Sequence, residues 1–245
     1  MYYANNTNYN NIITSSINFC EPDFFIFNFI AEFFNALSSC YIALCGLYGI
    51  LYKNTTNEWK IFLMYFLLFI IGIGSFLLHA TLQWIPQSMD EVPMMWLNLS
   101  ILYVFVCAII KKYNLCINSF YVQLLFATFA LIQTILYYCY RNIYWVFLLN
   151  FGSTLCLIIY IFIYNIINNE PFFKFKWQYP IKMFLLAGFL WIIDMIYCDL
   201  LLPYYINGLL IIPGITFHVF WHIFISHSVF NVINIISTMY YENNN

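Results

Sequence analysis

The sequence predicts an all-α, polytopic membrane protein with seven transmembrane helices. Of its 245 residues, 64% are hydrophobic and only 7% are charged, whereas a soluble domain carries about 25% charged residues. The hydrophobic residues form long continuous runs without the alternation of a half-buried β-strand, which favours helices over barrel strands. The chain therefore has too few charges to cover a water-facing surface, and we expect lipid to be its main solvent.

Seven apolar runs are long enough to cross a bilayer core, which takes about 20 helical residues. They lie at residues 29–51, 61–80, 92–110, 119–138, 143–165, 182–199 and 207–232. We expect a single membrane domain over residues 1–245, with an N-terminal segment at 1–28 and a C-terminal tail at 233–245. The first ten residues lack the basic and apolar regions of a cleaved signal peptide, so none is expected.

Basic residues set the predicted orientation, because cytoplasmic loops are enriched in lysine and arginine. Only Arg141 falls on one side of the membrane, and seven lysines fall on the other: Lys53, Lys60, Lys111, Lys112, Lys174, Lys176 and Lys182. The lysine side is therefore expected to be cytosolic, with the N-terminus lumenal or extracellular and the C-terminus in the cytosol. The net charge of −2 gives no indication of a nucleic-acid partner.

The four histidines are unusual in so apolar a chain. His218 and His222 are four residues apart, so both rings project from one face of the seventh helix. His79 lies near the lumenal end of the second helix and can reach the same depth. Three histidines with an open fourth position form a common catalytic zinc site. A lone intramembrane histidine can instead make an interhelical hydrogen bond, and that is the role expected of His227.

Two further polar residues lie near His79 in the sequence. Ser75 precedes it by one helical turn on the same face, and Asp90 is expected after a short loop, just ahead of the third helix. Taken alone, a helical serine usually bonds to its own backbone, and an acid at a helix start is often only a cap. Together with three histidines, they predict a zinc hydrolase with a general base and a hydroxyl beside the forming oxyanion.

Five sequence blocks carry a resemblance to a known family. They are FCEPDFFIFNFIAEFFN, GIGSFLLHATL, MDEVPM, WIIDMIYCD and FHVFWHIF, in this order over about residues 18–225. The chain resembles the alkaline ceramidases, which are seven-helix zinc membrane amidases in a superfamily that includes adiponectin receptors. The resemblance implies cleavage of the ceramide N-acyl amide to a sphingoid base and a fatty acid. It implies that His79, His218 and His222 bind zinc and that Ser75 and Asp90 complete the active site.

The resemblance also implies a calcium site next to the first helix. Its ligands would be Asn18, the carbonyl of Phe19, Glu21, Asp23 and Glu32, and hard oxygen ligands of this kind suit calcium. The family's usual acid at position 18 is an amide here and its usual amide at position 23 is an acid, so the ligand charge is preserved. We expect calcium to tune the activity. The alternative is an acidic cluster that only caps the first helix.

Two cysteines are expected at the lumenal end of the chain, in an oxidising compartment. By resemblance, they form the disulfide Cys20–Cys198, whereas the other cysteines are expected mainly as small apolar residues in the spans. We expect an endoplasmic reticulum or Golgi membrane protein whose partners are ceramide, related sphingolipids and other membrane lipids, with no obligate protein partner.

Three alternatives remain open from the sequence. One is a receptor of the adiponectin-receptor type, although the lysine distribution opposes its orientation. The others are a membrane hydrolase acting on another lipid ester and an inactive protein with a structural zinc ion.

Overall fold

The computed structural model describes residues 14–53, 58–167, 177–208 and 212–242, and most of these residues are helical. These residues form eight α-helices and one π-helical turn, with no strand beyond an isolated bridge between Phe27 and Ile30. Seven of the helices are long and apolar enough to cross a membrane. The predicted fold class, an all-α polytopic membrane protein, is confirmed.

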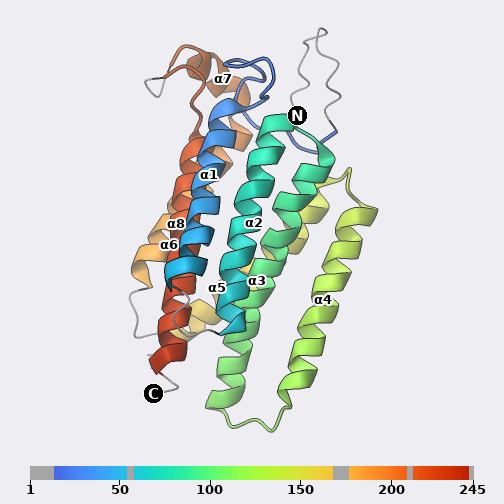
Figure 1. Cartoon of the computed structure of the whole chain (residues 1–245), viewed down its shortest axis with the longest axis vertical. Coiled ribbons are helices and arrows are strands. Elements are labelled where there is room, and N and C mark those ends of the chain that lie inside the picture. The colour runs from blue at the N-terminus through green and yellow to red at the C-terminus, as the bar shows by residue number, and fades with distance from the viewer. Residues whose placement is uncertain (1–13, 54–57, 168–176, 209–211, 243–245) are drawn as a thin grey trace. The chain divides into compact units, whose positions relative to one another are not determined.

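The chain divides into two compact units, residues 1–90 with 176–245 and residues 91–175. The first unit contains six helical elements and the first turns of α3 (Trp84–Lys112). They are α1 (Phe33–Tyr48), the π-helical turn η1 (Gly49–Lys53), α2 (Trp59–Thr81), α6 (Gln178–Ile196), α7 (Cys198–Ile206) and α8 (Phe217–Glu242). Helix α1 packs against both α2 and α8, and α6 packs along α8 (Figure 1).

Glycines allow α1 and α2 to approach closely. A Cβ atom on Gly46 would lie 2.3 Å from the backbone nitrogen of Phe69, and one on Gly72 would lie 2.1 Å from that of Ala43. Both distances are far below van der Waals contact, so only glycine fits at either position. Small residues at such contacts are typical of helix pairs in membranes. In lipid there is no hydrophobic effect between helices, so close backbone packing provides much of the attraction.

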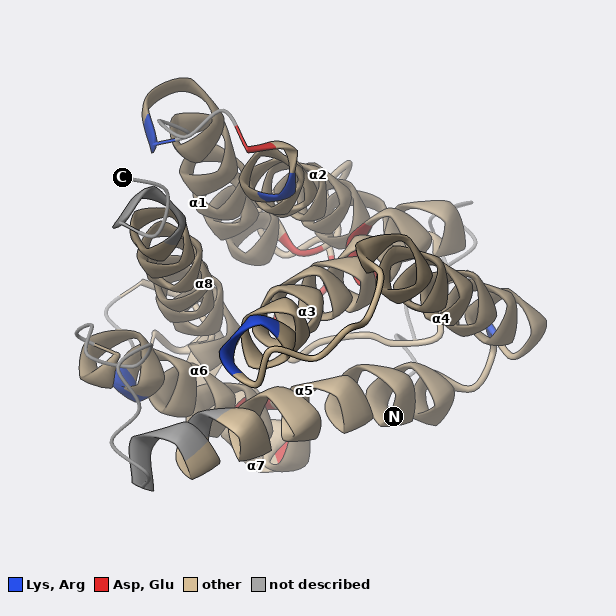
Figure 2. Cartoon of the chain, turned by 90° about the horizontal axis from the view of Figure 1, so that it is seen from below, with Lys and Arg blue, Asp and Glu red and all other residues tan. Residues whose placement is uncertain are grey.

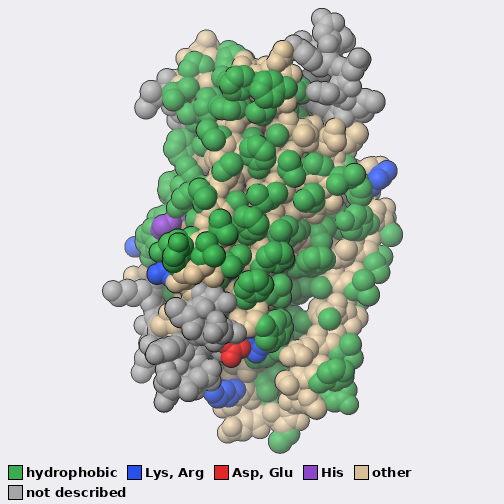
Figure 3. All heavy atoms as spheres, viewed as in Figure 1, with side chains coloured by type: hydrophobic (Ala, Val, Ile, Leu, Met, Phe, Trp, Pro, Cys, Tyr) green, Lys and Arg blue, Asp and Glu red, His purple; other side chains and the backbone are tan. Residues whose placement is uncertain are grey.

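The second unit contains the rest of α3 with α4 (Ser119–Cys139) and α5 (Tyr144–Ile167). Val92, Met95, Tyr137 and Phe147 form its buried core. Asn118 caps α4, since its side chain accepts a hydrogen bond from the backbone N–H of Phe120 at 2.9 Å. Both units keep many large apolar side chains exposed, as expected of surfaces that face lipid, and hydrophobic side chains spread over the face seen in Figure 3.

The start of the third helix differs from the prediction. Helix α3 begins at Trp84, so Asp90 lies inside the helix and not ahead of it. Pro86 falls in the first turn, where the missing N–H of a proline leaves no helical hydrogen bond unmade. The polar residues around it therefore continue the helix, although they interrupt the apolar run from which the span was predicted.

The last predicted span was too long at its N-terminal end. Helix α8 begins at Phe217 and not near residue 207, because Pro213 and Gly214 interrupt the chain. Gly214 has a φ of +93°, a conformation that side chains disfavour. The sixth span ends at Ile196, and a separate helix, α7, follows it. His218 therefore lies in the first turn of α8.

The described basic residues follow the predicted pattern within each unit (Figure 2). In the first unit, Lys53 ends η1 and Lys60 and Lys182 lie in the first turns of α2 and α6, at the ends of the helices away from the start of α1. Lys174 and Lys176 lie outside the described residues. The orientation in the membrane and the single-domain organisation remain predictions.

Candidate metal centre

Three histidines come together inside the first unit. His79 lies near the C-terminal end of α2, and His218 and His222 lie in the first two turns of α8. One nitrogen from each ring lies within 4.8 Å of the others, and the residues are at most 1% exposed. Helical periodicity aligns the pair on α8, and the packing of α1 against α2 and α8 brings His79 to it. This group could hold a metal ion.

Hydrogen bonds orient two of the rings. The Nδ1 atom of His79 is hydrogen-bonded to the carboxylate of Glu32, and Nδ1 of His222 lies 2.7 Å from the hydroxyl of Ser38. Metal-binding histidines usually bond through their second nitrogen to a carboxylate, carbonyl or water, which fixes the tautomer and ring orientation. In both residues Nε2 is then left to face the centre of the group.

His218 provides the test of whether a metal fits. Both of its ring nitrogens are buried and neither has a hydrogen-bond partner. A buried polar atom without a partner costs about 1–3 kcal/mol, and a metal ligand bond at one nitrogen removes part of that cost. Three neutral imidazoles form a donor set suited to zinc, copper, iron or nickel. The residues present therefore fit a transition-metal ion.

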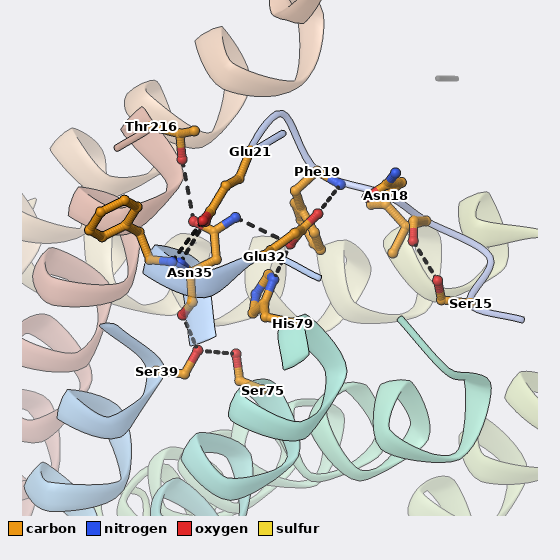
Figure 4. A network of polar contacts seen from close by, with 12 residues as sticks. Ser15, Asn18, Phe19, Glu21, Glu32, Asn35, Ser39, Ser75, His79 and Thr216 are labelled. Carbon is orange, nitrogen blue, oxygen red and sulfur yellow. Dashed lines mark hydrogen bonds and ion pairs between the residues drawn. The ribbon is translucent and has the colours of Figure 1, made fainter. Parts of the chain in front are cut away.

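Ser75 points from α2 towards this group. Its Oγ atom lies 2.9 Å from Oγ of Ser39 (Figure 4). It also lies 3.4 Å from Nε2 of His222. Ser39 also donates a hydrogen bond to the backbone carbonyl of Asn35 at 2.8 Å. The side chain of Ser75 thus contacts other helices, in contrast to the local backbone bond that is common for a helical serine.

A glycine allows Asp90 to lie close to the turn of α2 that carries Ser75. A Cβ atom on Gly74 would lie 2.5 Å from the backbone nitrogen of Asp90 and 2.4 Å from the carbonyl oxygen of Met89. Because Gly74 has no side chain, the first turns of α3 can contact α2 next to Ser75. Asp90 is itself buried. The structure therefore brings Ser75, the three histidines and Asp90 into one region of the first unit.

Three acidic residues gather just before α1. Both carboxylate oxygens of Glu21 accept hydrogen bonds from the backbone N–H groups of Phe34 and Asn35, each at 2.7 Å. Glu21 therefore caps the positive end of the helix dipole of α1. Asp23 accepts a hydrogen bond from the amide of Asn18 at 3.1 Å.

Glu32 connects this cluster to the histidines. One carboxylate oxygen accepts the backbone N–H of Phe19 at 3.0 Å, and the other is bonded to both the side chain of Asn35, at 3.2 Å, and Nδ1 of His79 (Figure 4). Glu32 is fully buried. A single carboxylate thus holds the N-terminal segment, α1 and a histidine of the candidate metal group.

Burial and the nearness of other acids disfavour the charged forms of the acidic cluster. Burial, followed by the charge of Glu32, raises the pKa of Glu21 to about 9 and that of Asp23 to about 7. Burial also raises the pKa of Glu32 to about 8, against the hydrogen bonds from Asn35 and Phe19. Oδ1 of Asn18 and Oδ1 of Asp23 are buried without a hydrogen-bond partner. Unpartnered oxygens among close carboxylates fit a hard cation such as calcium.

A disulfide joins this segment to the other end of the unit's sequence. Cys20 and Cys198 are bonded, with their Cα atoms 5.4 Å apart, as the resemblance implies. Cys198 is the first residue of α7. The segment that carries the acidic cluster is therefore covalently held next to the chain that leads into α8.

The part played by the ring of Phe19 was not predicted, because this residue was expected to contribute only its backbone carbonyl. Its ring centroid lies 4.1 Å from that of His218 and 4.9 Å from that of His79. Trp221 stacks on His218 at 4.8 Å. These rings pack around the histidine whose nitrogens have no partner. Phe19 is nearly 200 residues from His218 in sequence, so no local pattern could reveal the contact.

Asn35, Ser38 and Ser39 were also missed, although one signal pointed to two of them, and the contact of Glu32 with His79 was not predicted. Glu32, Asn35 and Ser39 follow one another at helical spacing in an otherwise apolar stretch, which indicates a polar face on α1. Ser38, beside that face, contacts His222. A helix in lipid carries such a face only where it meets polar partners.

Asp194, in α6, is a further buried acid. Its carboxylate accepts a hydrogen bond from the hydroxyl of Tyr205 at 2.9 Å. The hydroxyl of Tyr205 in turn accepts a hydrogen bond from the backbone N–H of Phe217, at the start of α8, at 3.4 Å. Asp194 and Tyr205 thus connect α6 to the first turn of α8, which carries His218. His227, as expected, makes an interhelical hydrogen bond, to Tyr41 at 3.2 Å.

Fold and site together define a helical membrane protein with a buried group that could hold a metal ion. Residues 11–245 match the family model described as Ceramidase, and the chain belongs to this family. Alkaline ceramidase 3 of Mus musculus is 27% identical over 216 residues, covering 86% of this chain and 78% of that protein. Alkaline ceramidase of Drosophila melanogaster is 25% identical over 242 residues, covering 94% and 78%.

A shorter match is closer in sequence. Alkaline ceramidase of Arabidopsis thaliana is 37% identical over 95 residues, covering 38% of this chain and 36% of that protein. The resemblance drawn from the sequence blocks is thereby confirmed, and so is the predicted class of enzyme, a ceramidase-type hydrolase.

Proposed function

We propose that the protein is a zinc-dependent ceramidase that hydrolyses the N-acyl amide bond of ceramide, releasing a sphingoid base and a fatty acid. The observation that carries the proposal is the buried group of three histidines, with ligand atoms within 4.8 Å of one another, in a member of the ceramidase family. Relatives along most of the chain are named as alkaline ceramidases, which supports the choice of substrate.

His79, His218 and His222 would hold the zinc ion. Zinc supplies Lewis acidity when bound and lowers the pKa of a water molecule from 15.7 to about 7. Three neutral imidazoles do not offset the charge of the ion. Glu32 and Ser38 keep two of the rings oriented through their Nδ1 atoms, so little reorganisation is needed when a ligand binds.

Ser75 would stabilise charge on the carbonyl oxygen of the amide. As water attacks the carbonyl carbon, that oxygen becomes an oxyanion, to which a hydroxyl can donate a hydrogen bond. Loss of one such donor typically raises a barrier by about 2.7–4 kcal/mol. The contact with Ser39 at 2.9 Å holds the Ser75 side chain towards the histidines before substrate arrives.

Asp90 would act as the general base and then as the general acid. Its carboxylate accepts the proton that the attacking water loses as the new C–O bond forms. The same proton then goes to the amide nitrogen as the C–N bond breaks, so the sphingoid base leaves as an amine and the acyl group as a fatty acid. The close contact between Gly74 and the start of α3 keeps Asp90 beside the turn that carries Ser75.

Calcium would bind the acidic cluster and tune this activity. Its ligands would be Asn18, the carbonyl of Phe19, Glu21, Asp23 and Glu32. The unpartnered oxygens of Asn18 and Asp23 support this proposal. Glu32 is bonded to both Phe19 N–H and His79, so a cation that neutralises the cluster also stabilises the orientation of a zinc ligand. Activity that does not change on chelation and re-addition of calcium would contradict this role.

The enzyme would work in an endoplasmic reticulum or Golgi membrane, with its N-terminus in the lumen. The Cys20–Cys198 disulfide supports an oxidising compartment on that side, and the described lysines support a cytosolic opposite side. Its substrates would be ceramide and related sphingolipids, which reach a buried site by diffusing in the membrane.

The test compares purified wild type with His218→Ala, each assayed for ceramide hydrolysis in detergent micelles and for bound zinc. We expect the variant to lose activity and zinc together. His227→Ala is the matched control, because His227 lies on the same helix but outside the group of three. Zinc binding by wild type without amide cleavage would contradict the ceramidase proposal and favour a receptor or an ester hydrolase.

A further inference from the structure

A short apolar loop precedes α1. It comprises residues 24–31, FFIFNFIA, and contains no charged side chain. Phe25 is 43% exposed and Phe29 is 70% exposed, and Ile26 and Phe27 are also exposed. Soluble proteins rarely present contiguous apolar surface of this kind unless it binds something. The loop is therefore a candidate interaction surface that the chemistry of the metal site does not explain.

The loop has a defined backbone. The N–H of Phe24 donates to the carbonyl of Ala31 at 2.7 Å and closes the loop at its base. Beyond the base, the N–H of Ala31 donates to the carbonyl of Ala80 at 3.0 Å, at the end of α2. The ring of Phe27 packs on those of Phe29 and Phe33, with centroids 5.4 and 5.0 Å away. The exposed rings are thus held outward by a fixed scaffold.

The position of the loop in the chain limits what can cover it. Residues 33–53 form a candidate membrane span of 21 residues, which is about 31 Å long at 1.5 Å per residue, close to the hydrocarbon core of about 30 Å. Phe29 lies four residues before this span, a reach of at most about 14 Å. The headgroup region on one side is about 5–8 Å thick, so the loop begins within reach of that region.

The surface of the loop continues into the apolar surface of α1 (Figure 3). Leu37 and Leu44 are 55% and 60% exposed along that helix, where lipid is the expected neighbour. Phenylalanine has no polar group to keep it at the water boundary, unlike the tyrosine and tryptophan of interfacial belts. A surface of phenylalanine and isoleucine, continuous with a lipid-facing helix, matches acyl chains better than water.

We propose that the loop at residues 24–31 inserts into the lipid leaflet next to the start of α1, with Phe25, Phe27 and Phe29 among the acyl chains. Its occupant is lipid, and not a second copy of the chain or another protein. Insertion fixes the acidic cluster, which lies on either side of the loop at Asp23 and Glu32, at the membrane surface. The proposal does not depend on the ceramidase activity.

The test labels position 29 with trifluoromethyl-phenylalanine, in full-length protein reconstituted into phosphatidylcholine nanodiscs. Broadening of the fluorine signal is measured with a nitroxide carried on a lipid acyl chain and, separately, with a water-soluble gadolinium complex. The same label at Leu44 gives the reference for a lipid-facing side chain, and the free amino acid in buffer gives the reference for water. Thermal unfolding of each labelled protein checks that it is folded, and position 25 provides a second site.

We expect the label at position 29 to respond as the Leu44 reference does, with stronger broadening by the lipid-borne nitroxide than by gadolinium. The reverse order would show that the loop faces water and would overturn the proposal. Protection from both reagents would show that protein covers the loop, which would overturn it in favour of contact with another part of the chain or with a second copy.

Discussion

Single side chains decide how well the candidate metal group is organised. Glu32 and Ser38 each bond to the Nδ1 atom of a histidine, and both come from α1 or its first flanking residue, whereas the histidines come from α2 and α8. The stability of the group therefore depends on residues that are not ligands. Substitutions at these positions separate metal affinity from the chemistry of the reaction.

Ser38→Ala removes the hydrogen-bond partner of His222 Nδ1 and leaves the ligand itself in place. Loss of such a partner typically lowers metal affinity about 10–100-fold, and we expect a change of that size for zinc. Competition with a zinc-selective chelator measures it. Ser100→Ala is the control, because Ser100 bonds only to its own helix backbone on an exposed face of α3. Equal zinc affinities for the two variants would contradict the role of Ser38.

Substitutions at Asn18 and Asp23 test the proposed calcium site by changing the charge of its ligands. Asp23→Asn removes one negative ligand and is expected to weaken calcium binding, since affinity depends on the number of charged ligands. The double variant Asn18→Asp with Asp23→Asn restores the charge and is expected to recover most of the affinity. Isothermal titration calorimetry with calcium measures both. A calcium affinity that is unchanged in the single variant, or that is not recovered in the double variant, would contradict the assignment of these ligands.

At the scale of helices, the contact between α1 and α2 positions many of the residues of the site. Glu32, Ser38 and Ser39 lie in or next to α1, and Ser75 and His79 lie on α2, so a small separation of the two helices moves both sides of the group. Glycines at 46 and 72 make the contact close. The geometry of the metal group is therefore a consequence of backbone packing between two neighbouring helices.

Gly72→Ala places a Cβ atom 2.1 Å from the backbone nitrogen of Ala43 and forces the helices apart. Overpacking of this kind typically costs about 1–3 kcal/mol, and we expect a lower melting temperature in detergent together with weaker zinc binding. Gly188→Ala is the matched control, because nothing lies within 4 Å of a Cβ atom there. Alanine is the better helix former, so that control should be neutral or slightly more stable. Equal melting temperatures for the two variants would contradict the close contact.

At the scale of the whole chain, one covalent bond spans most of the sequence. The Cys20–Cys198 disulfide joins residues 178 positions apart and holds the N-terminal segment to α7. The segment supplies Phe19 and Glu32 to the surroundings of the histidines, and α7 leads into α8, which carries two of them. The two sequence segments of the first unit, residues 1–90 and 176–245, are thus linked next to the site.

Cys20→Ser with Cys198→Ser removes this link. Loss of a disulfide closing a long loop typically costs about 2–5 kcal/mol, and we expect a clear drop in melting temperature and in calcium affinity. Cys116→Ser is the control, because Cys116 is free and exposed. The wild type should show the same losses under a reducing agent, and the double variant should then be insensitive to it. A double variant as stable as Cys116→Ser would contradict the role of the bond.

The sequence by itself predicted seven spans and placed His218 and His222 on one helix face, and its resemblance to a family predicted the class of enzyme. These depend on local properties, namely the length of apolar runs, recognisable blocks and a spacing of four residues on one helix. The helix starts at Trp84 and Phe217 were not predicted correctly. A proline is tolerated in the first turn of α3, so that helix begins earlier than its apolar run, and a proline–glycine pair delays the start of α8.

Only the tertiary structure decided how the site is supported. Ser38 meets His222 across 184 positions and Glu32 meets His79 across 47. The ring of Phe19 meets His218 through a segment fixed by a disulfide. Contacts of this length depend on which helix faces pack together, and packing is set by close backbone approach at glycines and by buried hydrogen bonds between helices. A pattern within one helix contains no information about its partner, so these contacts became visible only once the helices were assembled.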